Sequence, residues 1–158
     1  MKYIILSVSL LISSISANSY STKSNWLMDT NSSDVRFQKI QKQLRGFDLA
    51  MVEVGYRFNS LYFAIKDNNL PLASYQLDKI KKAIKNGIER REKRTKNSKI
   101  FFLDTKYKDM QKSFKSKDTN IILQEFNRLQ ESCNSCHNAE RVPFIKVITP
   151  KYRWQPIK

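Results

Sequence analysis

Histidine and cysteine are scarce in this chain, with one histidine and two cysteines among 158 residues. A structural zinc site requires four ligands, which is more than these three side chains supply. Coordination of a metal by two histidines is also excluded, because there is no second histidine. All three side chains fall within five consecutive residues, Cys133-Asn134-Ser135-Cys136-His137.

Long apolar runs are missing as well, and the mostly apolar stretch Tyr3–Ile12 is too short to cross a bilayer. It follows the basic start Met1-Lys2 and precedes small residues that end at Ala17, which is the order of a secretory signal peptide. We therefore expect residues 1–17 to be a cleaved signal peptide and the product to be exported without a transmembrane helix. No cysteine lies near the cleavage point, so a lipid anchor is not expected.

The five-residue motif has the form Cys-x-x-Cys-His, which is the attachment sequence of a c-type haem. Two thiols three residues apart are separated by about one helical turn, so both can add to the vinyl groups on one edge of a porphyrin. The histidine that follows can then reach the iron as an axial ligand. A thioredoxin-like pair would need a βαβ setting, and a simple disulfide would leave His137 unexplained. The pattern predicts one covalently bound haem c, held by Cys133 and Cys136, with His137 as iron ligand.

Acidic residues are outnumbered by basic ones, with 14 Asp and Glu against 29 Lys and Arg and a formal net charge of +15. Such a charge can indicate a nucleic-acid-binding protein. Export argues against nucleic acid, and the basic residues are scattered along helical stretches instead of alternating with aromatic residues on one element. Runs such as Arg90-Arg91 are typical of solvated helix faces. We expect the charge as a whole to steer the protein toward an acidic redox partner protein or an anionic surface.

Proline is absent from the interior of four stretches with helical periodicity. In the first, from about Asp34 to Asp67, apolar residues recur at alternating spacings of four and three. The second begins near Pro71, the third runs from Ile100 to Phe114, and the fourth follows Asp118. The two cysteines continue the apolar positions of the fourth stretch in phase: Ile122, Phe126, Leu129, Cys133 and Cys136.

Four helices with short connections predict an all-α protein, an antiparallel up-down-up-down four-helix bundle over residues 34–141 whose last helix carries the haem-attachment motif. Residues 18–33 are rich in Ser, Asn and Thr and are expected to form a flexible N-terminal arm. The prolines of residues 142–158 preclude a long helix there. We predict an extended C-terminal tail that packs on the bundle and buries its apolar side chains.

A four-helix chain with a haem motif near its C-terminus resembles the class II cytochromes c, the cytochrome c′ family. In that family two residues, an aromatic residue and an arginine follow the motif. This chain reads CNSCHNAER, so Arg141 matches the arginine, while Glu140 replaces the aromatic residue and the long tail is a departure. The resemblance implies that His137 is the proximal ligand with Arg141 near it, and that the protein is periplasmic. Family members often pair through their first two helices, so a homodimer is a further expectation.

The opposite, distal side of the iron decides function within that family. Some members leave it covered by an apolar side chain, and their five-coordinate iron binds small gases. Others supply a methionine from the first helix and carry electrons. Met51 is the candidate distal ligand here, with core packing as the alternative, and Met28 and Met110 are further candidates. Leu44 and Phe47 are the residues we expect over a vacant distal face.

These observations predict an exported, periplasmic, monohaem c-type cytochrome that transfers single electrons and is not itself an enzyme. Two alternatives stay open: a gas-binding protein for nitric oxide or carbon monoxide, and a haem subunit of a larger periplasmic oxidoreductase. A peroxidase is disfavoured because the chain has no second histidine to act as an acid-base catalyst on the distal side.

Overall fold

The computed structural model describes residues 25–30 and 32–158. Within these ranges the chain is all-helical, without strands, as the sequence predicts. It divides into two units, Met1–Ile40 and Gln41–Lys158, each of which is described by itself. The predicted signal peptide, residues 1–17, lies outside the described residues, as do residues 18–24 of the predicted arm.

In the first unit, residues 26–29 form a turn and helix α1 begins a few residues later. The side-chain oxygen of Asn25 accepts hydrogen bonds from the backbone N–H groups of Leu27 and Met28, at 3.2 and 2.9 Å, and so closes the turn. Helix α1 spans Ser33–Gln43 and therefore ends at the beginning of the second unit.

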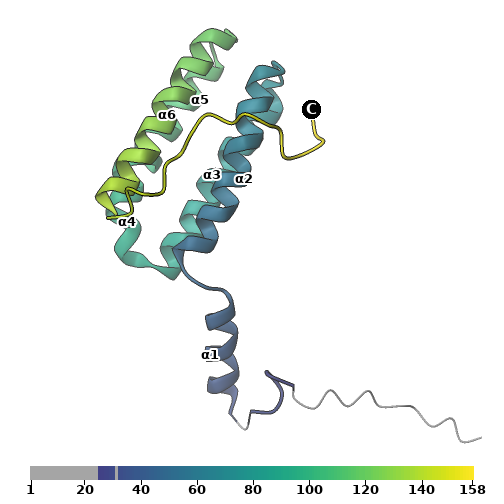
Figure 1. Cartoon of the computed structure of the whole chain (residues 1–158), viewed down its shortest axis with the longest axis vertical. Coiled ribbons are helices and arrows are strands. Elements are labelled where there is room, and N and C mark those ends of the chain that lie inside the picture. The colour runs from purple at the N-terminus through teal and green to yellow at the C-terminus, as the bar shows by residue number, and fades with distance from the viewer. Residues whose placement is uncertain (1–24, 31) are drawn as a thin grey trace, which may run out of the picture. The chain divides into compact units, whose positions relative to one another are not determined.

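Four longer helices make up most of the second unit: α2 (Phe47–Lys66), α3 (Leu70–Arg90), α5 (Lys106–Phe114) and α6 (Thr119–Ala139) (Figure 1). Three short segments lie between α3 and α5: a 3₁₀ turn (Glu92–Arg94), the short α4 (Thr95–Ser98) and a π-helical turn (Lys99–Leu103). Helix α2 packs against α3 and α6, and α5 also packs against α3 and α6, which is the arrangement of a helical bundle. No helix among the described residues is both long enough and apolar enough to span a membrane.

The predicted continuous helix from Asp34 to Asp67 is wrong, because the chain breaks between Gln43 and Phe47. Arg45 has a φ of 56°, a left-handed conformation that an α-helix cannot contain. The next residue, Gly46, is buried against Arg91, and a Cβ built on it would lie 3.0 Å from the Arg91 Nε atom. The break places the start of α2 at Phe47, so Met51 lies about one turn into that helix.

The starts of α3 and α6 are capped as their sequences suggest. The Asn69 side chain accepts a hydrogen bond from the Leu72 N–H, and Pro71 lies in the first turn of α3. The Asp118 carboxylate accepts from the N–H groups of Asn120 and Ile121 at the start of α6. These side chains satisfy backbone donors that have no partner within the helix.

The core of the second unit lies where the four longer helices meet. It contains Leu61 and Ile65 of α2, Leu77 of α3, Met110 of α5 and Phe126 of α6, all of which are fully buried. Phe126 is its aromatic centre, with its ring centroid 4.5 Å from that of Phe58 and 5.2 Å from that of Tyr62. Burying one such side chain contributes roughly 1.5–3 kcal/mol, so these contacts dominate the stability of the unit.

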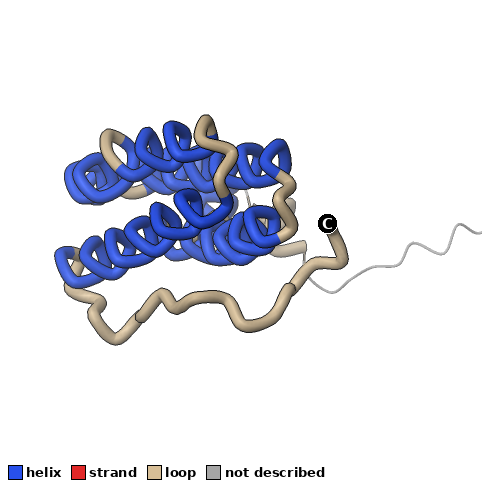
Figure 2. The backbone as a smooth tube through the Cα atoms, turned by 90° about the horizontal axis from the view of Figure 1, so that it is seen from above, coloured by secondary structure: helices blue, strands red, loops and turns tan. Residues whose placement is uncertain are grey.

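The C-terminal tail, residues 142–158, contains no helix and runs past α6 and α2 (Figures 1 and 2). On α2, the Asn59 side chain donates to the Tyr152 carbonyl at 2.8 Å and accepts from the Trp154 N–H at 3.2 Å. The Arg153 guanidinium pairs with the carboxylate of Asp67 at 2.7 Å. Polar side chains of the bundle therefore bind the backbone of the tail.

The expectation that the tail buries its apolar side chains is wrong for most of them. Phe144 is 79% exposed, Tyr152 78% and Trp154 66%. Val147 is partly buried against the core, and Val142 is partly buried as well. The tail is held mainly by hydrogen bonds to its backbone, which leaves its large side chains free to face solvent.

Candidate haem-attachment site

The motif Cys133-Asn134-Ser135-Cys136-His137 occupies the last turns of α6, which ends at Ala139. Both cysteines are free thiols and both are partly buried. Cys133 packs against the core cluster, in phase with the buried Leu129 of the preceding turn. The predicted continuation of the apolar stripe into the motif is therefore confirmed at Cys133.

The imidazole of His137 is oriented by the backbone of the tail. Its Nδ1 atom lies 2.7 Å from the carbonyl oxygen of Ile145. A carbonyl can only accept a hydrogen bond, so Nδ1 must carry the proton. In a neutral imidazole the other nitrogen, Nε2, then has its lone pair available to a metal. Histidine ligands of metals commonly have this arrangement, with the second ring nitrogen donating to a carbonyl or carboxylate.

A tight turn brings the Ile145 carbonyl back to His137. The Ile145 N–H donates to the Val142 carbonyl at 3.0 Å, with Pro143 as the second residue of the turn. Proline suits this position because its ring sets φ near the value that the turn requires. The Val142 N–H in turn donates to the His137 carbonyl at 2.9 Å. The segment from His137 to Ile145 is thus closed on itself by backbone hydrogen bonds.

Arg141, the predicted neighbour of the haem, terminates α6 in this structure. Its φ is 62°, and its N–H donates to the Asn138 carbonyl at 3.0 Å. Together with the bond from Val142 to His137, this is the pattern of a Schellman motif, in which glycine is the usual residue at the left-handed position. The side chain of Arg141 is exposed. The structure thus gives the backbone of Arg141 a helix-ending role, and its predicted place beside the haem stays a prediction.

Asn134, between the two cysteines, binds the tail at a second point. Its side-chain Nδ2 donates to the Val147 carbonyl at 3.0 Å, and its Oδ1 accepts from the Val147 N–H at 2.8 Å. Sequence reasoning missed this residue, since positions between the cysteines have no assigned chemistry. An asparagine side chain can bind a backbone group, but its presence in the sequence does not indicate which group it binds.

Glu140, which occupies the aromatic position of the class II family, binds the segment before the π-helical turn. Its carboxylate pairs with the Arg94 guanidinium and accepts a hydrogen bond from the Asn97 side chain at 2.9 Å. Ser132, the residue directly before Cys133, donates a hydrogen bond from its hydroxyl to the Phe101 carbonyl at 2.7 Å. The end of α6 is therefore fixed on this side by polar contacts to α4 and its neighbours.

The two thiols have pKa values that do not favour thiolates. Burial, together with a smaller contribution from the neighbouring thiol of Cys136, raises the pKa of Cys133 to about 12. Burial also raises the pKa of Cys136, although the nearby Arg94 guanidinium opposes this. Catalytic and metal-binding cysteines usually have lowered pKa values. The structure therefore disfavours a redox-active pair, and among the described residues no three Cys, His, Asp or Glu side chains gather as a metal site requires.

The candidate distal residues differ in their surroundings. Met51 is partly buried and packs against the same core cluster as Cys133. Met110 is completely buried in that core, whereas Met28 belongs to the first unit and is 59% exposed. Leu44 lies in the break before α2 and is also exposed, while Phe47 is partly buried. Of these candidates, Met51 and Phe47 are the two partly buried residues of α2 that pack against the core cluster.

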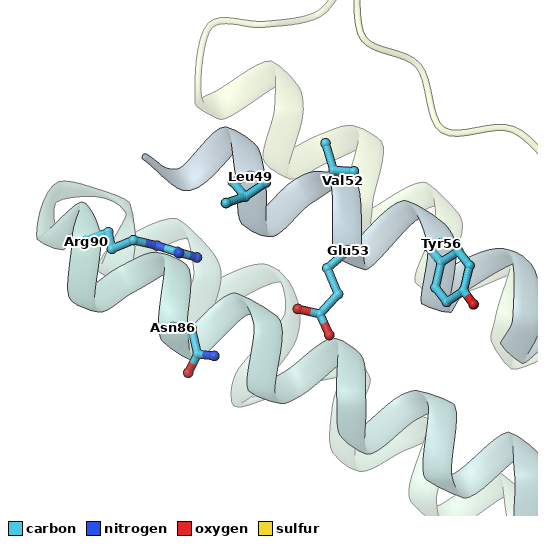
Figure 3. A pocket seen from close by; sticks show the side chains of 6 residues that line it. All are labelled: Leu49, Val52, Glu53, Tyr56, Asn86 and Arg90. Atoms are coloured by element: carbon cyan, nitrogen blue, oxygen red, sulfur yellow. The ribbon is translucent and has the colours of Figure 1, made fainter. Parts of the chain in front are cut away.

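A depression near these residues lies outside the motif, between α2 and α3 (Figure 3). It has a volume of about 380 Å³ and is lined by Leu49, Val52, Glu53, Tyr56, Asn86 and Arg90. It is open to solvent, and none of its lining residues belongs to the motif or to the tail.

The residues of the motif fit a covalently bound haem. The two free thiols lie one helical turn apart, and His137 presents Nε2 as a free ligand because Nδ1 is engaged. Comparisons with protein-family models, with curated proteins and with solved structures found no match for the chain.

Proposed function

We propose that this protein is an exported, periplasmic, monohaem c-type cytochrome that transfers single electrons. The observation that carries the proposal is the state of His137, whose Nδ1 is held by the Ile145 carbonyl directly after a Cys-x-x-Cys pair. The proposed architecture is an antiparallel up-down-up-down bundle with an extended tail packed on it. In this architecture the attachment helix α6 lies beside α2, with which it is in contact.

In this proposal Cys133 and Cys136 hold the haem through thioether bonds and His137 binds the iron through Nε2. The haem, when bound, supplies a reversible Fe(II)/Fe(III) couple. The chain contributes a helix end fixed by Glu140 and Ser132, and an imidazole whose tautomer is set by the tail. The excess of basic side chains, with a net charge of +15, suits an acidic redox partner.

Met51 is the residue we propose as the distal ligand. It lies on the first turns of α2, is partly buried, and shares the core cluster with Cys133. A thioether ligand opposite a histidine raises the reduction potential, as suits an electron carrier. Replacement of Met51 by Ala should convert a low-spin spectrum into a high-spin one, while the matched Met110→Ala change, in the core of α5, should leave the ligation unchanged.

Visible spectroscopy of the purified wild-type protein tests the proposed function. A low-spin spectrum in both oxidation states is expected for the electron carrier. A high-spin ferrous spectrum that shifts when carbon monoxide is added would contradict it and support the gas-binding alternative. Replacement of Cys133 and Cys136 by Ala should abolish covalent attachment, and Asn127→Ala, exposed on the same helix, is the matched control.

A further inference from the structure

We propose that the C-terminal tail is the device that positions the axial imidazole, and that Asn134, inside the attachment motif, is its anchor. The inference rests on the proposed function and assigns a role to a motif position and to a segment that the class II resemblance does not cover. Its basis is a pair of contacts between side chains of α6 and the backbone of the tail, from His137 to Ile145 and from Asn134 to Val147.

The two contacts have a common geometry along both segments. His137 follows Asn134 by three residues on α6, so both side chains project from the same face of the helix. Ile145 and Val147 are two residues apart on the tail, and their backbone groups meet these two side chains. Two attachment points fix the register of the tail along the helix, which one hydrogen bond alone would leave free to slide.

The Asn134 contact is the stronger of the two anchors. Its amide makes two hydrogen bonds to one peptide residue, Val147, at 3.0 and 2.8 Å, and both groups are partly buried. The paired donor and acceptor of an amide match the N–H and C=O of a backbone, so the side chain acts as one more peptide partner. Without this anchor, the imidazole and the backbone turn from Val142 would hold the Ile145 carbonyl, and the next contact of the tail on α6 would be the exposed hydrogen bond from Thr149 to Gln130.

The segment from His137 to Val147 is short and has little conformational freedom. Pro143 limits the backbone of the turn, and hydrogen bonds from Val142 to His137 and from Ile145 to Val142 close it. Once Val147 is held by Asn134, the position of the Ile145 carbonyl is therefore nearly determined. The tail delivers an acceptor to Nδ1 in the same way that a carboxylate does in other metal sites.

The far end of the tail is held independently on α2. Asn59 makes the same type of paired contact, to Tyr152 and Trp154, at 2.8 and 3.2 Å. Asn59 is a different side chain on a different helix, so its removal loosens the tail without touching His137. This separates a general loss of tail packing from a specific loss of the Ile145 contact.

A hydrogen bond from Nδ1–H makes an imidazole a better electron donor to a metal, and loss of such a partner typically weakens metal binding by roughly 10-fold to 100-fold. Loss of the Asn134 anchor should therefore weaken the histidine ligand and favour Fe(II) over Fe(III). The midpoint potential of Asn134→Leu, a change of similar size that removes both hydrogen bonds, should be more positive than that of the wild type.

The sharpest test uses the haem-free full chain, because His137 is the only histidine and its ring nitrogens give a single set of signals. In alkaline buffer, where imidazole is neutral, a long-range ¹H–¹⁵N spectrum reports which nitrogen carries the proton. The wild type should show the Nδ1–H tautomer, whereas histidine free in water prefers Nε2–H. Asn134→Leu should move His137 toward Nε2–H, and Asn127→Ala, exposed on the same helix, should leave it unchanged.

An Nε2–H tautomer in the wild type, or an unchanged Nδ1–H tautomer in Asn134→Leu, would overturn the inference. Where the haem-free chain or the Leu variant does not fold, Asn134→Asp in the haem-loaded protein decides, since it keeps the size but loses the donor. A potential equal to that of the wild type in Asn134→Asp, or an equal shift in Asn59→Ala, would show that the tail only stabilises the fold. A chain without covalent haem would refute the proposed function and leave the tautomer result standing by itself.

Discussion

The core and the C-terminal tail of this protein are held by opposite means. In the core, Phe126, Leu61 and Ile65 are completely buried and belong to one cluster of apolar side chains. In the tail, the large apolar side chains such as Phe144 face solvent, while hydrogen bonds bind the backbone to asparagine side chains. Side-chain packing thus makes the bundle, whereas polar side chains of the bundle place the tail over the attachment motif.

The largest effect should come from the core. Phe126→Ala removes the ring that packs on Phe58 and Tyr62, and a buried phenylalanine typically costs about 3–5 kcal/mol of unfolding free energy when truncated. Phe144→Ala, at a position that is 79% exposed, should change it by about 0.5 kcal/mol or less. Urea denaturation measures the unfolding free energy of both variants. Similar decreases in that free energy would contradict the burial of Phe126 and the exposure of Phe144.

The next effect concerns the end of α6. Arg94→Ala leaves the carboxylate of Glu140, whose side chain is 15% exposed, with Asn97 as its remaining partner. Loss of the partner of a partly buried charge should cost about 1–3 kcal/mol. Arg128→Ala is the matched control, since this arginine side chain is 63% exposed in its pair with Glu125 and should cost at most about 1 kcal/mol. Equal thermal or urea stability of the two variants would contradict the view that the contact between Arg94 and Glu140 stabilises the end of α6.

A smaller effect is expected where the tail meets α2. Asn59→Ala removes two hydrogen bonds to the tail, each worth about 1 kcal/mol, and part of this is regained because the tail groups can bind water. The Trp154 amide should lose protection from hydrogen exchange, while amides in the middle of α6 should keep theirs. Unchanged exchange at Trp154 would contradict the account of how the tail is held.

The last expected effect is a pH dependence within the helical bundle. Burial raises the pKa of Tyr107 from 10.0 to about 12, helped by its hydrogen bond to the Asp78 carboxylate. The folded state therefore favours the neutral phenol, and this contribution is complete below pH 10 and is lost as the pH rises from 10 toward 12. The stability advantage of the wild type over Tyr107→Phe should shrink across that interval, as urea titrations at several pH values would show. A constant difference would contradict the raised pKa.

Apolar periodicity was enough to predict the all-helical class and the stripe that leads to Cys133, while Pro71 and Asp118 marked the starts of α3 and α6. The break before α2 was not predictable, because it depends on Arg45 in a left-handed conformation that arginine rarely adopts. The role of the tail was equally hidden. The contacts of Asn134 and Asn59 join polar side chains to backbone groups far along the chain, and such pairs follow no sequence period.

The candidate site shows the same division. The spacing of Cys133, Cys136 and His137 predicts haem attachment from residue type and helical geometry, and that attachment stays a prediction. The structure confirms the helical geometry, because the motif lies in the last turns of α6 with both thiols free. The Ile145 acceptor of His137 is a backbone carbonyl, which every residue possesses, so no side-chain pattern could identify it. The aromatic and apolar residues of the tail suggested burial, yet its backbone carries the contacts.

The intact mass of the exported protein, measured after denaturation, tests the central claim most directly. The account predicts the chain without residues 1–17 plus the mass of one haem, which survives denaturation because it is held by thioether bonds at Cys133 and Cys136. The double variant with Ala at both positions should have the mass of the polypeptide alone. A wild-type mass without haem, or a haem mass retained in the double variant, would contradict the account.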